Sequence, residues 1–351
     1  MLLILGLGSL IVAVCGLFPG GSECWLAGQM EHVEWNGLRL YDTIFPLFLF
    51  ISGITFPFSY TKQVDAGASR ARIYRKVFVR ALVLFLLGIV YNGCLGRPLS
   101  EWRFASVLAR IGFAWMFAAI IYMNTRRNST RLAIMAAILV GYWAALRFIP
   151  VPGIPAGAGP FSFEGNLCAY VDRLVLPGRL YDGTMDPEGV LGVIPAVVTA
   201  LLGMLAGQFV RREGMSGGRK VLLMFAAAAV LLAIGLVWSR WFPINKKLWS
   251  STFVLVVGAY SLAMFALFYW LIDVKGWRKW AFPLAVVGMN PITLYMASNI
   301  VDFHHTACFL GGELAGALPG AWGGVVLAAI FLALVWLLAY FLYRKKIFLK
   351  V

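Results

Sequence analysis

Ten long apolar segments are the feature that most constrains how this chain can fold. Each is close to the roughly 20 residues that an α-helix needs to cross the hydrocarbon core of a bilayer. They fall at about residues 2–18, 42–60, 77–93, 105–123, 132–149, 189–210, 221–238, 252–272, 281–299 and 321–343. Of the 351 residues, 61% are hydrophobic and 13% are charged, which lies outside the range of soluble globular proteins. We therefore predict an all-α, polytopic membrane bundle of about ten transmembrane helices that forms one domain over residues 1–351.

Lysine and arginine gather in every second loop between these segments. Of the 30 basic residues, 20 lie in the stretches 62–80, 126–131, 211–220, 275–279 and 344–350. Because loops rich in Lys and Arg stay on the cytoplasmic side, these stretches and both termini are predicted to be cytoplasmic. The net charge of +15 is thus a topology signal, and no nucleic-acid partner is predicted. We expect a multi-pass protein of the inner, cytoplasmic membrane.

The longest loop, residues 150–188, falls on the opposite, extracytoplasmic side. Loops of this length in compact proteins are often lids or substrate rims. Two apolar segments are predicted to contain a helix break, the second at Pro46 and the ninth at Asn290-Pro291. Such breaks are tolerated where the freed backbone faces protein or a wet cavity, and an ordinary proline kink is the alternative interpretation.

A polar cluster enters the second apolar segment from the extracytoplasmic side. It comprises Glu31, His32, Glu34, Trp35, Asn36, Arg39 and Asp42. Charge at membrane depth is expensive, so it indicates function by default. Arg39 and Asp42 are three residues apart and could simply pair, which would leave His32 as a solvated loop residue. In the functional interpretation, the imidazole serves as a base or nucleophile near neutral pH, which suits acyl transfer.

Metal binding is not predicted from the histidines or cysteines. His304 and His305 are adjacent, and the sequence has no carboxylate-rich pattern around them that would suit a metal. The five cysteines show neither metal spacing nor a CxxC pair, and they are interpreted as small apolar residues. One disulfide on the outer face is the alternative.

The stretch "EHVEWNGLRLYDTIFPLFLFISG" at residues 31–53 resembles a motif of the heparan-α-glucosaminide N-acetyltransferase family, and more closely its bacterial NagX-like branch. Further similar stretches are "RFASVLARIGFAW", "VDRLVLPGRLYDGTMDPEGVLGVIPA", "FPINKKLWSSTFVL" and "GMNPITLYMASNIVDFHH", so the resemblance covers nearly the whole chain. It implies a membrane enzyme that moves acetyl from cytosolic acetyl-CoA, as co-substrate, to the amino group of a glucosamine or glucosaminide on the far side. The family usually opens with a basic segment, so we expect an N-terminal cytoplasmic segment upstream of Met1.

The resemblance places the family's active histidine on His32. Asp42 or Glu34 is expected to orient its ring, and Asn290, at the Pro291 break, to donate a hydrogen bond to the reacting carbonyl oxygen. Trp35, Asn36, Glu34 and Arg39 are the predicted substrate-binding residues. At the cytoplasmic mouth, the predicted CoA-binding residues are Arg72, Arg75, Arg126 and Arg127, for which a pure topology role is the alternative.

Two other functions fit the same residues. A secondary transporter of amino sugars would use the outer acids and broken helices as a binding site. An acyltransferase of cell-envelope glycans would keep the chemistry and change the substrates. Predicted partners are acetyl-CoA, an amino sugar or glucosamine-terminated saccharide and the lipid bilayer, and the resemblance is compatible with a homodimer.

Overall fold

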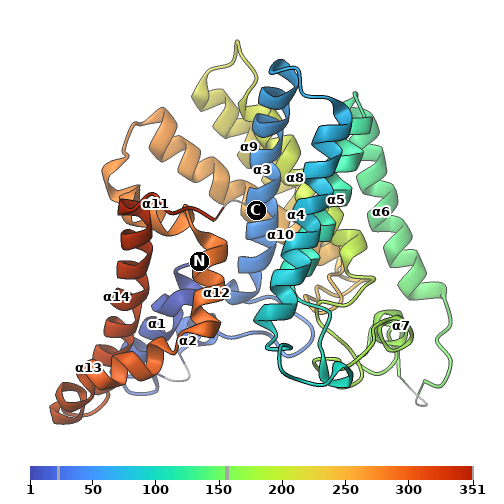
Figure 1. Cartoon of the computed structure of the whole chain (residues 1–351). Coiled ribbons are helices and arrows are strands. Elements are labelled where there is room, and N and C mark those ends of the chain that lie inside the picture. The colour runs from blue at the N-terminus through green and yellow to red at the C-terminus, as the bar shows by residue number, and fades with distance from the viewer. Residues whose placement is uncertain (22–23, 155–157, 350–351) are drawn as a thin grey trace. The chain divides into compact units, whose positions relative to one another are not determined.

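The computed structural model describes residues 1–21, 24–154 and 158–349, and most of these residues lie in helices (Figure 1). Two compact units form: unit 1 is Met1–Val33, Arg39–Ile44 and Lys275–Val351, and unit 2 is Glu34–Leu38 and Phe45–Val274. Within the described ranges there is no β-strand, only an isolated bridge between Arg103 and Gly178. The all-α prediction is confirmed.

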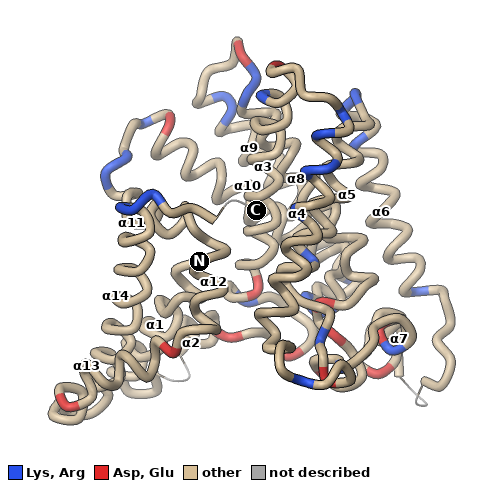
Figure 2. The backbone as a smooth tube through the Cα atoms, in the orientation of Figure 1, with Lys and Arg blue, Asp and Glu red and all other residues tan. Residues whose placement is uncertain are grey.

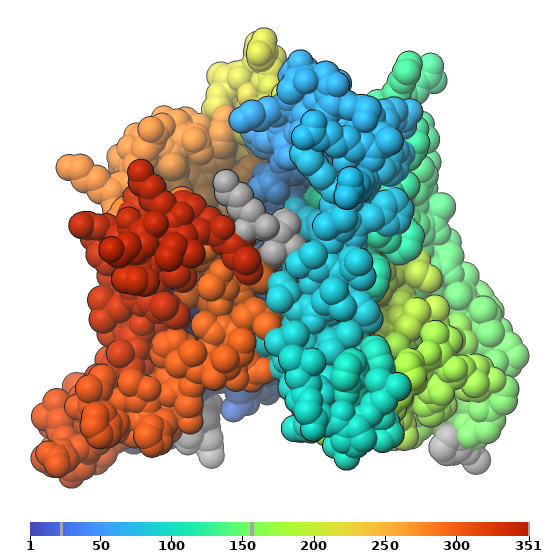
Figure 3. All heavy atoms as spheres, viewed as in Figure 1, coloured from blue at the N-terminus to red at the C-terminus, as the bar shows by residue number. Residues whose placement is uncertain are grey.

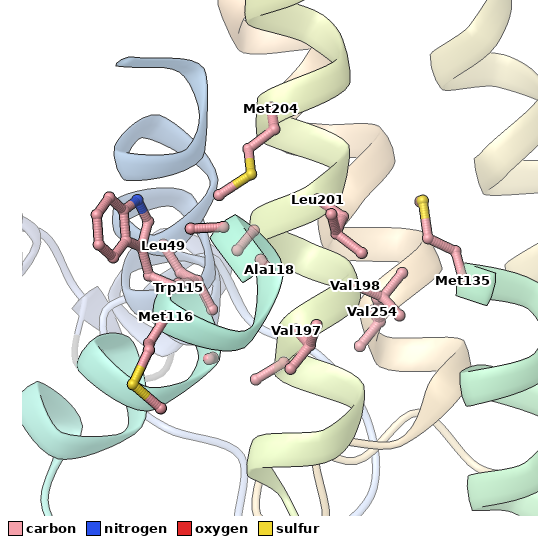
Figure 4. Close-up of a cluster of buried hydrophobic side chains, with 14 of the residues drawn as sticks. Leu49, Trp115, Met116, Ala118, Met135, Val197, Val198, Leu201, Met204 and Val254 are labelled. Carbon is pink, nitrogen blue, oxygen red and sulfur yellow. The ribbon is translucent and has the colours of Figure 1, made fainter. Parts of the chain in front are cut away.

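Unit 2 contains most of the long helices. Its α-helices are α3 (Ile44–Asp65), α4 (Arg70–Tyr91), α5 (Val107–Asn124), α6 (Asn128–Phe148), the short α7 (Leu167–Val175), α8 (Val193–Val210), α9 (Gly217–Trp238) and α10 (Ser251–Tyr269). Helices α8 and α10 are buried along much of their length. Figure 4 shows Val198 and Leu201 of α8 packed in a cluster with Leu49, Trp115 and Val254 from three other helices.

Helices α3 and α8 approach each other through glycine. A Cβ at Gly203 would lie 2.0 Å from the Phe50 carbonyl oxygen, and one at Gly207 would lie 2.3 Å from the carbonyl oxygen of Ile54. Small residues four apart let two membrane helices pack backbone against backbone. This contact fixes α3, the helix that follows the polar cluster, against the centre of unit 2.

Unit 1 is built on α14 (Trp322–Arg344). The other helices of this unit are α1 (Gly8–Cys15), α2 (Trp25–Gly28), α11 (Phe282–Gly288), α12 (Pro291–Ile300) and α13 (Phe303–Ala317). Leu5, Val286 and Leu294 meet Val335 and Ala339 of α14 in a buried cluster.

Seven helices in the described residues are long and apolar enough to cross a membrane. The pair Lys279–Gly288 and Pro291–Ile300 makes an eighth if it is one span bent by 62°, as the Asn290-Pro291 pattern predicted. The predicted span at 2–18 is a 13-residue apolar helix, Leu3–Cys15, which at 1.5 Å per residue reaches about 20 Å. Ten spans are therefore not confirmed.

Helix α4 contains the predicted span at 77–93 but is not among the seven helices that are apolar enough to cross. Its 22 residues are long enough to cross, but Arg75, Lys76 and Arg80 add charge to its first half. Phe78, Leu82 and Leu86 are exposed on this helix, which runs along the surface of unit 2 (Figure 3). Such an apolar surface suits contact with lipid.

The prediction of a break at Pro46 is wrong. Helix α3 begins at Ile44, so Pro46 lies in its first turn, where a missing backbone N–H removes no helical hydrogen bond. Pro57 is the proline inside this helix.

Candidate active site

The two ends of the polar cluster, residues 29–33 and 39–43, pair in unit 1 and form a structure that we call the clasp. The Gln29 carbonyl oxygen accepts a hydrogen bond from the Tyr41 N–H at 3.1 Å, and its side-chain oxygen accepts one from the Leu40 N–H at 2.9 Å. A short 3₁₀ turn, Leu40–Thr43, follows directly and leads into α3. The segment before the turn is thereby held beside it, which brings His32 to Asp42.

His32 and Asp42 are hydrogen-bonded side chain to side chain. The His32 Nδ1 atom lies 2.7 Å from the Asp42 Oδ1 atom. The side chain of Asp42 is 1% exposed and that of His32 is 47% exposed, so a buried carboxyl group holds an accessible imidazole. Of the two carboxylates predicted to orient the ring, Asp42 makes this contact, while Glu34 lies exposed in unit 2.

Backbone groups fix the Asp42 carboxyl group in turn. Its Oδ2 atom accepts hydrogen bonds from the Val33 N–H at 3.3 Å and the Arg39 N–H at 3.2 Å. The predicted link between Arg39 and Asp42 therefore forms through the Arg39 backbone. The Arg39 guanidinium instead lies 3.1 Å from a Glu31 carboxylate oxygen. Asp42 thus joins both sides of the clasp.

The ring of Tyr41 sets the face of the imidazole. The two ring centroids are 4.7 Å apart with an interplanar angle of 61°, an edge-to-face contact. With Nδ1 against Asp42, the ring's Nε2 is the nitrogen on the side away from the carboxyl group. A histidine held in this way, with a carboxylate at Nδ1, has the arrangement of a general base or nucleophile.

Trp35 and Asn36 belong to unit 2, where loops hold both. The Trp35 Nε1–H donates to the Phe161 carbonyl oxygen at 2.9 Å, and its ring packs edge-to-face on Phe163. The Asn36 side-chain oxygen accepts a hydrogen bond from Asn245 at 3.1 Å. Trp35 is therefore fixed to the loop 150–188, and Asn36 to the loop between α9 and α10.

Asn290 is buried in unit 1 and binds the carboxy-terminal segment. Its Nδ2 donates to the Ile347 carbonyl oxygen at 2.8 Å, and its Oδ1 accepts from the Leu349 N–H at 3.3 Å. This is a packing role for the amide, which was the alternative to a catalytic one. A part for Asn290 in catalysis stays a prediction.

The four predicted CoA-binding arginines, Arg72, Arg75, Arg126 and Arg127, are all exposed at one end of unit 2, where basic residues gather (Figure 2). Arg131 lies at the same end, and the sequence did not reveal that its side chain is buried and hydrogen-bonded. A buried arginine and an exposed one look alike in a basic loop. The Arg131 side chain is 4% exposed, bonds Gln208 at 2.8 Å and stacks on Tyr122.

A second missed group lies at the other end of unit 2. Arg103 binds both carboxylate oxygens of Asp186 at 2.7 Å and also contacts Glu188. Arg110 is 3% exposed, donates to the Gly189 carbonyl oxygen and stacks on Trp249. These contacts fix the end of the predicted outer loop. The partners are about 80 residues apart in sequence, so the sequence alone does not show that they meet.

Asp172 in α7 predicts a pH dependence of stability. Burial raises the pKa of this carboxyl group from 3.8 to about 6, against the opposing effect of hydrogen bonds from the Val190 and Asp186 N–H groups. Between these two pH values the folded chain binds more protons than the unfolded chain, so stability falls as pH rises through this window. From pH 7 to pH 4.5, wild type should gain about 2 kcal/mol relative to Asp172→Asn.

Thermal unfolding of both chains in detergent at the two pH values measures this. Other titrating groups are shared by the two chains and cancel in the comparison. A difference in Tm that stays constant from pH 4.5 to pH 7 would contradict the buried, titrating Asp172.

Among the residues that the structure describes, no group of three or more His, Cys, Asp or Glu side chains is arranged to hold a metal ion. His304 and His305 are exposed on α13.

Two curated proteins are similar to this chain. Heparan-alpha-glucosaminide N-acetyltransferase of Homo sapiens is 29% identical over 387 aligned positions, and the Mus musculus protein of the same name is also 29% identical over 387. Each alignment covers 95% of this chain and 57% of the relative, so the chain spans little more than half the length of these relatives. No profile of a known protein family matches. Over almost its whole length, the chain is similar in sequence to part of the heparan-α-glucosaminide N-acetyltransferases.

Proposed function

We propose that this chain is a transmembrane N-acetyltransferase that moves acetyl from cytosolic acetyl-CoA to the amino group of an extracytoplasmic glucosamine or glucosaminide. The observation that carries the proposal is the 2.7 Å contact between His32 and the buried Asp42. It lies in the stretch whose residues resemble the family's active-histidine motif, and the curated relatives are named for N-acetyl transfer to a glucosaminide.

In the proposed reaction, His32 acts through Nε2. A sugar ammonium group gives its proton to this nitrogen, and the resulting amine attacks the thioester carbonyl carbon. A C–N bond forms, the C–S bond breaks, and CoA leaves as a thiolate. The acylated nitrogen gives its second proton to that thiolate, and His32 releases the first proton to solvent. In the covalent variant, Nε2 attacks the thioester first, the C–S bond breaks and CoA leaves as a thiolate. Nε2 then carries the acetyl group until attack by the amine breaks its bond to the acetyl carbon. Asp42 holds the ring in place on either route.

The basic end of unit 2 is proposed to face the cytoplasm and to receive CoA. Acetyl-CoA is a polyanion that cannot cross the bilayer, so its phosphates need cations at the inner mouth. Arg72, Arg75, Arg126 and Arg127 would supply a diffuse positive field there, and Arg131 a fixed charge. Trp35, Asn36, Glu34 and Arg39 are proposed to meet the sugar. A homodimer in the inner membrane and a place in the bacterial branch complete the proposal.

A secondary transporter of amino sugars is the rival function. The bent helix pair before and after Asn290 favours it, because broken helices commonly form substrate sites in carriers. Product mass separates the two functions. Purified protein in detergent with acetyl-CoA and glucosamine should yield a sugar heavier by one acetyl group. Recovery of glucosamine alone, together with its uptake into protein-containing vesicles, would favour the carrier.

The sidedness of unit 2 predicts a labelling pattern. Ser100 lies exposed between α4 and α5, and Ser129 lies exposed in the first turn of α6. In intact cells, an impermeant maleimide should label Ser100→Cys above the background of the unmutated chain, and should label Ser129→Cys only after permeabilisation. The reverse pattern would show that the basic end of unit 2 faces away from the cytoplasm, which would contradict its proposed binding of cytosolic acetyl-CoA.

A further inference from the structure

Cys15 and Cys24 stand at the two ends of the turn that connects α1 to α2. Cys15 is the last residue of α1 and is buried, and Cys24 immediately precedes α2 and is partly exposed. Three backbone hydrogen bonds, each spanning three residues, link these ends: Phe18 N–H to Cys15, Gly21 N–H to Phe18, and Cys24 N–H to Gly21. The first two of these hydrogen bonds turn the chain back so that Gly21 lies against the end of α1.

Gly21 shows how closely the turn is pressed against α1. A Cβ at this position would lie 1.6 Å from the Cys15 carbonyl oxygen, so any other residue would collide with backbone. The close approach brings the two thiols near enough for each to shift the pKa of the other. Two cysteines nine positions apart are thus adjacent in space.

The two sulfur atoms differ in chemical character. The Ala27 N–H donates to the Cys24 Sγ atom at 3.3 Å. That hydrogen bond, with a smaller contribution from the Cys15 thiol, lowers the pKa of Cys24. The neighbouring Cys24 thiol raises the pKa of Cys15. A thiolate is the nucleophile in thiol–disulfide exchange, so Cys24 is the attacking group and Cys15 the resolving one.

We infer that Cys15 and Cys24 form a reversible disulfide that fastens α2 to the end of α1. The Cys24 thiolate attacks a disulfide of an external oxidant, forms a mixed disulfide and releases one thiolate of that oxidant. Cys15 then loses its proton, attacks the Cys24 sulfur and releases the second thiolate. Two cysteine thiols are oxidised and one oxidant disulfide is reduced to two thiols. The inference rests on the extracytoplasmic placement in the proposed function, because disulfides persist in oxidising compartments.

The bond would act on the segment that carries the candidate active site. Helix α2 ends at Gly28, and the next residue, Gln29, makes the two hydrogen bonds to Leu40 and Tyr41 that close the clasp. The Tyr41 ring in turn packs against His32. Fastening α2 therefore restrains the support of the imidazole, and reduction loosens it.

Peptide mapping tests the bond without any measurement of acetyl transfer. The purified full chain in detergent is incubated with oxidised glutathione or with dithiothreitol, free thiols are blocked with N-ethylmaleimide, and the chain is cut after glutamate with endoproteinase Glu-C, which separates the two cysteines at Glu23. In the oxidised sample, Cys15 and Cys24 should be recovered as one linked pair, two hydrogen masses lighter than the separate peptides. After dithiothreitol, both should carry maleimide. Separate maleimide or glutathione adducts on both residues after oxidation would overturn the inference.

Matched variants sharpen the result. Cys308→Ser, which removes another partly exposed thiol, should keep the linked pair. Cys15→Ser should retain glutathione on Cys24, because the resolving thiol is gone, whereas Cys24→Ser should leave Cys15 largely blocked by maleimide. Amide hydrogen exchange at residues 25–31 should be several-fold slower in the oxidised wild-type chain than in the reduced chain. Equal exchange rates would refute the fastening of α2. Failure of these readouts leaves the acetyltransferase proposal standing, and a linked pair in an inactive enzyme would refute only that proposal.

Discussion

His32→Ala should lower acetylation of glucosamine by about 10² to 10⁴ or more, because loss of a general base or nucleophile removes that much rate in characterised enzymes. The substitution removes Nε2 and the 2.7 Å contact with Asp42 together. Expression and acetyl-CoA binding should stay near wild type, since a histidine side chain that is 47% exposed contributes little to helix packing. Initial rates at saturating acetyl-CoA, with product identified by mass, measure the effect.

The matched controls are His304→Ala and His305→Ala, which remove exposed imidazoles on α13 of the same unit. Both should acetylate glucosamine at close to the wild-type rate. Wild-type activity in His32→Ala would show that His32 is not the catalytic histidine. The His304→Ala and His305→Ala variants would then show whether His304 or His305 is.

Asp42→Asn should reduce the rate in the same direction but less, by roughly 10- to 10³-fold, because it disturbs the orientation of the ring without removing it. An amide has one oxygen where the carboxyl group has two, and the Asp42 oxygens accept hydrogen bonds from His32, Val33 and Arg39. If the amide oxygen stays with the Val33 and Arg39 N–H groups, the amide NH2 faces the His32 Nδ1 atom and favours the opposite imidazole tautomer; in the other amide orientation both backbone contacts are lost. If Asp42 positions His32, the variant's kcat should fall with little change in the KM for acetyl-CoA, and its pH–rate profile should shift.

A purely structural role for Asp42 makes a different prediction. It would lower Tm and the amount of active protein while leaving the pH–rate profile of the remaining enzyme unchanged. Glu31→Gln is the matched control, because it neutralises a neighbouring carboxylate that pairs with Arg39 at an exposed position. Its activity and pH profile should match wild type within about twofold, as surface ion pairs contribute little.

The sequence predicted the helical class, and it limited the expected carboxylate partner of His32 to Asp42 or Glu34, because both depend on local patterns. Apolar runs of about 20 residues specify helices whatever they pack against. The Asn290-Pro291 break was visible because proline cannot continue a hydrogen-bonded helix. His32 and Asp42 are ten residues apart, and the intervening turn brings them together with contacts made almost entirely within residues 29–42.

The parts that the sequence did not reveal depend on contacts between distant segments. Arg103 meets Asp186 across 83 positions, and Arg131 meets Gln208 across 77, so neither arginine could be separated from its solvated neighbours. Asn290 bonds to the segment after α14, a partner that no local pattern indicates. The start of α3 at Ile44 turned Pro46 from an expected break into a first-turn residue.

Acetyl transfer across a sealed bilayer tests the central claim most directly. Protein is reconstituted into liposomes with glucosamine trapped inside and acetyl-CoA added outside, and molecules with their cytoplasmic side facing outward are the ones that react. We predict N-acetylated sugar inside the liposomes for wild type and its near absence for His32→Ala. Unmodified glucosamine throughout, with acetyl-CoA left intact in the presence of wild-type protein, would contradict the proposed function.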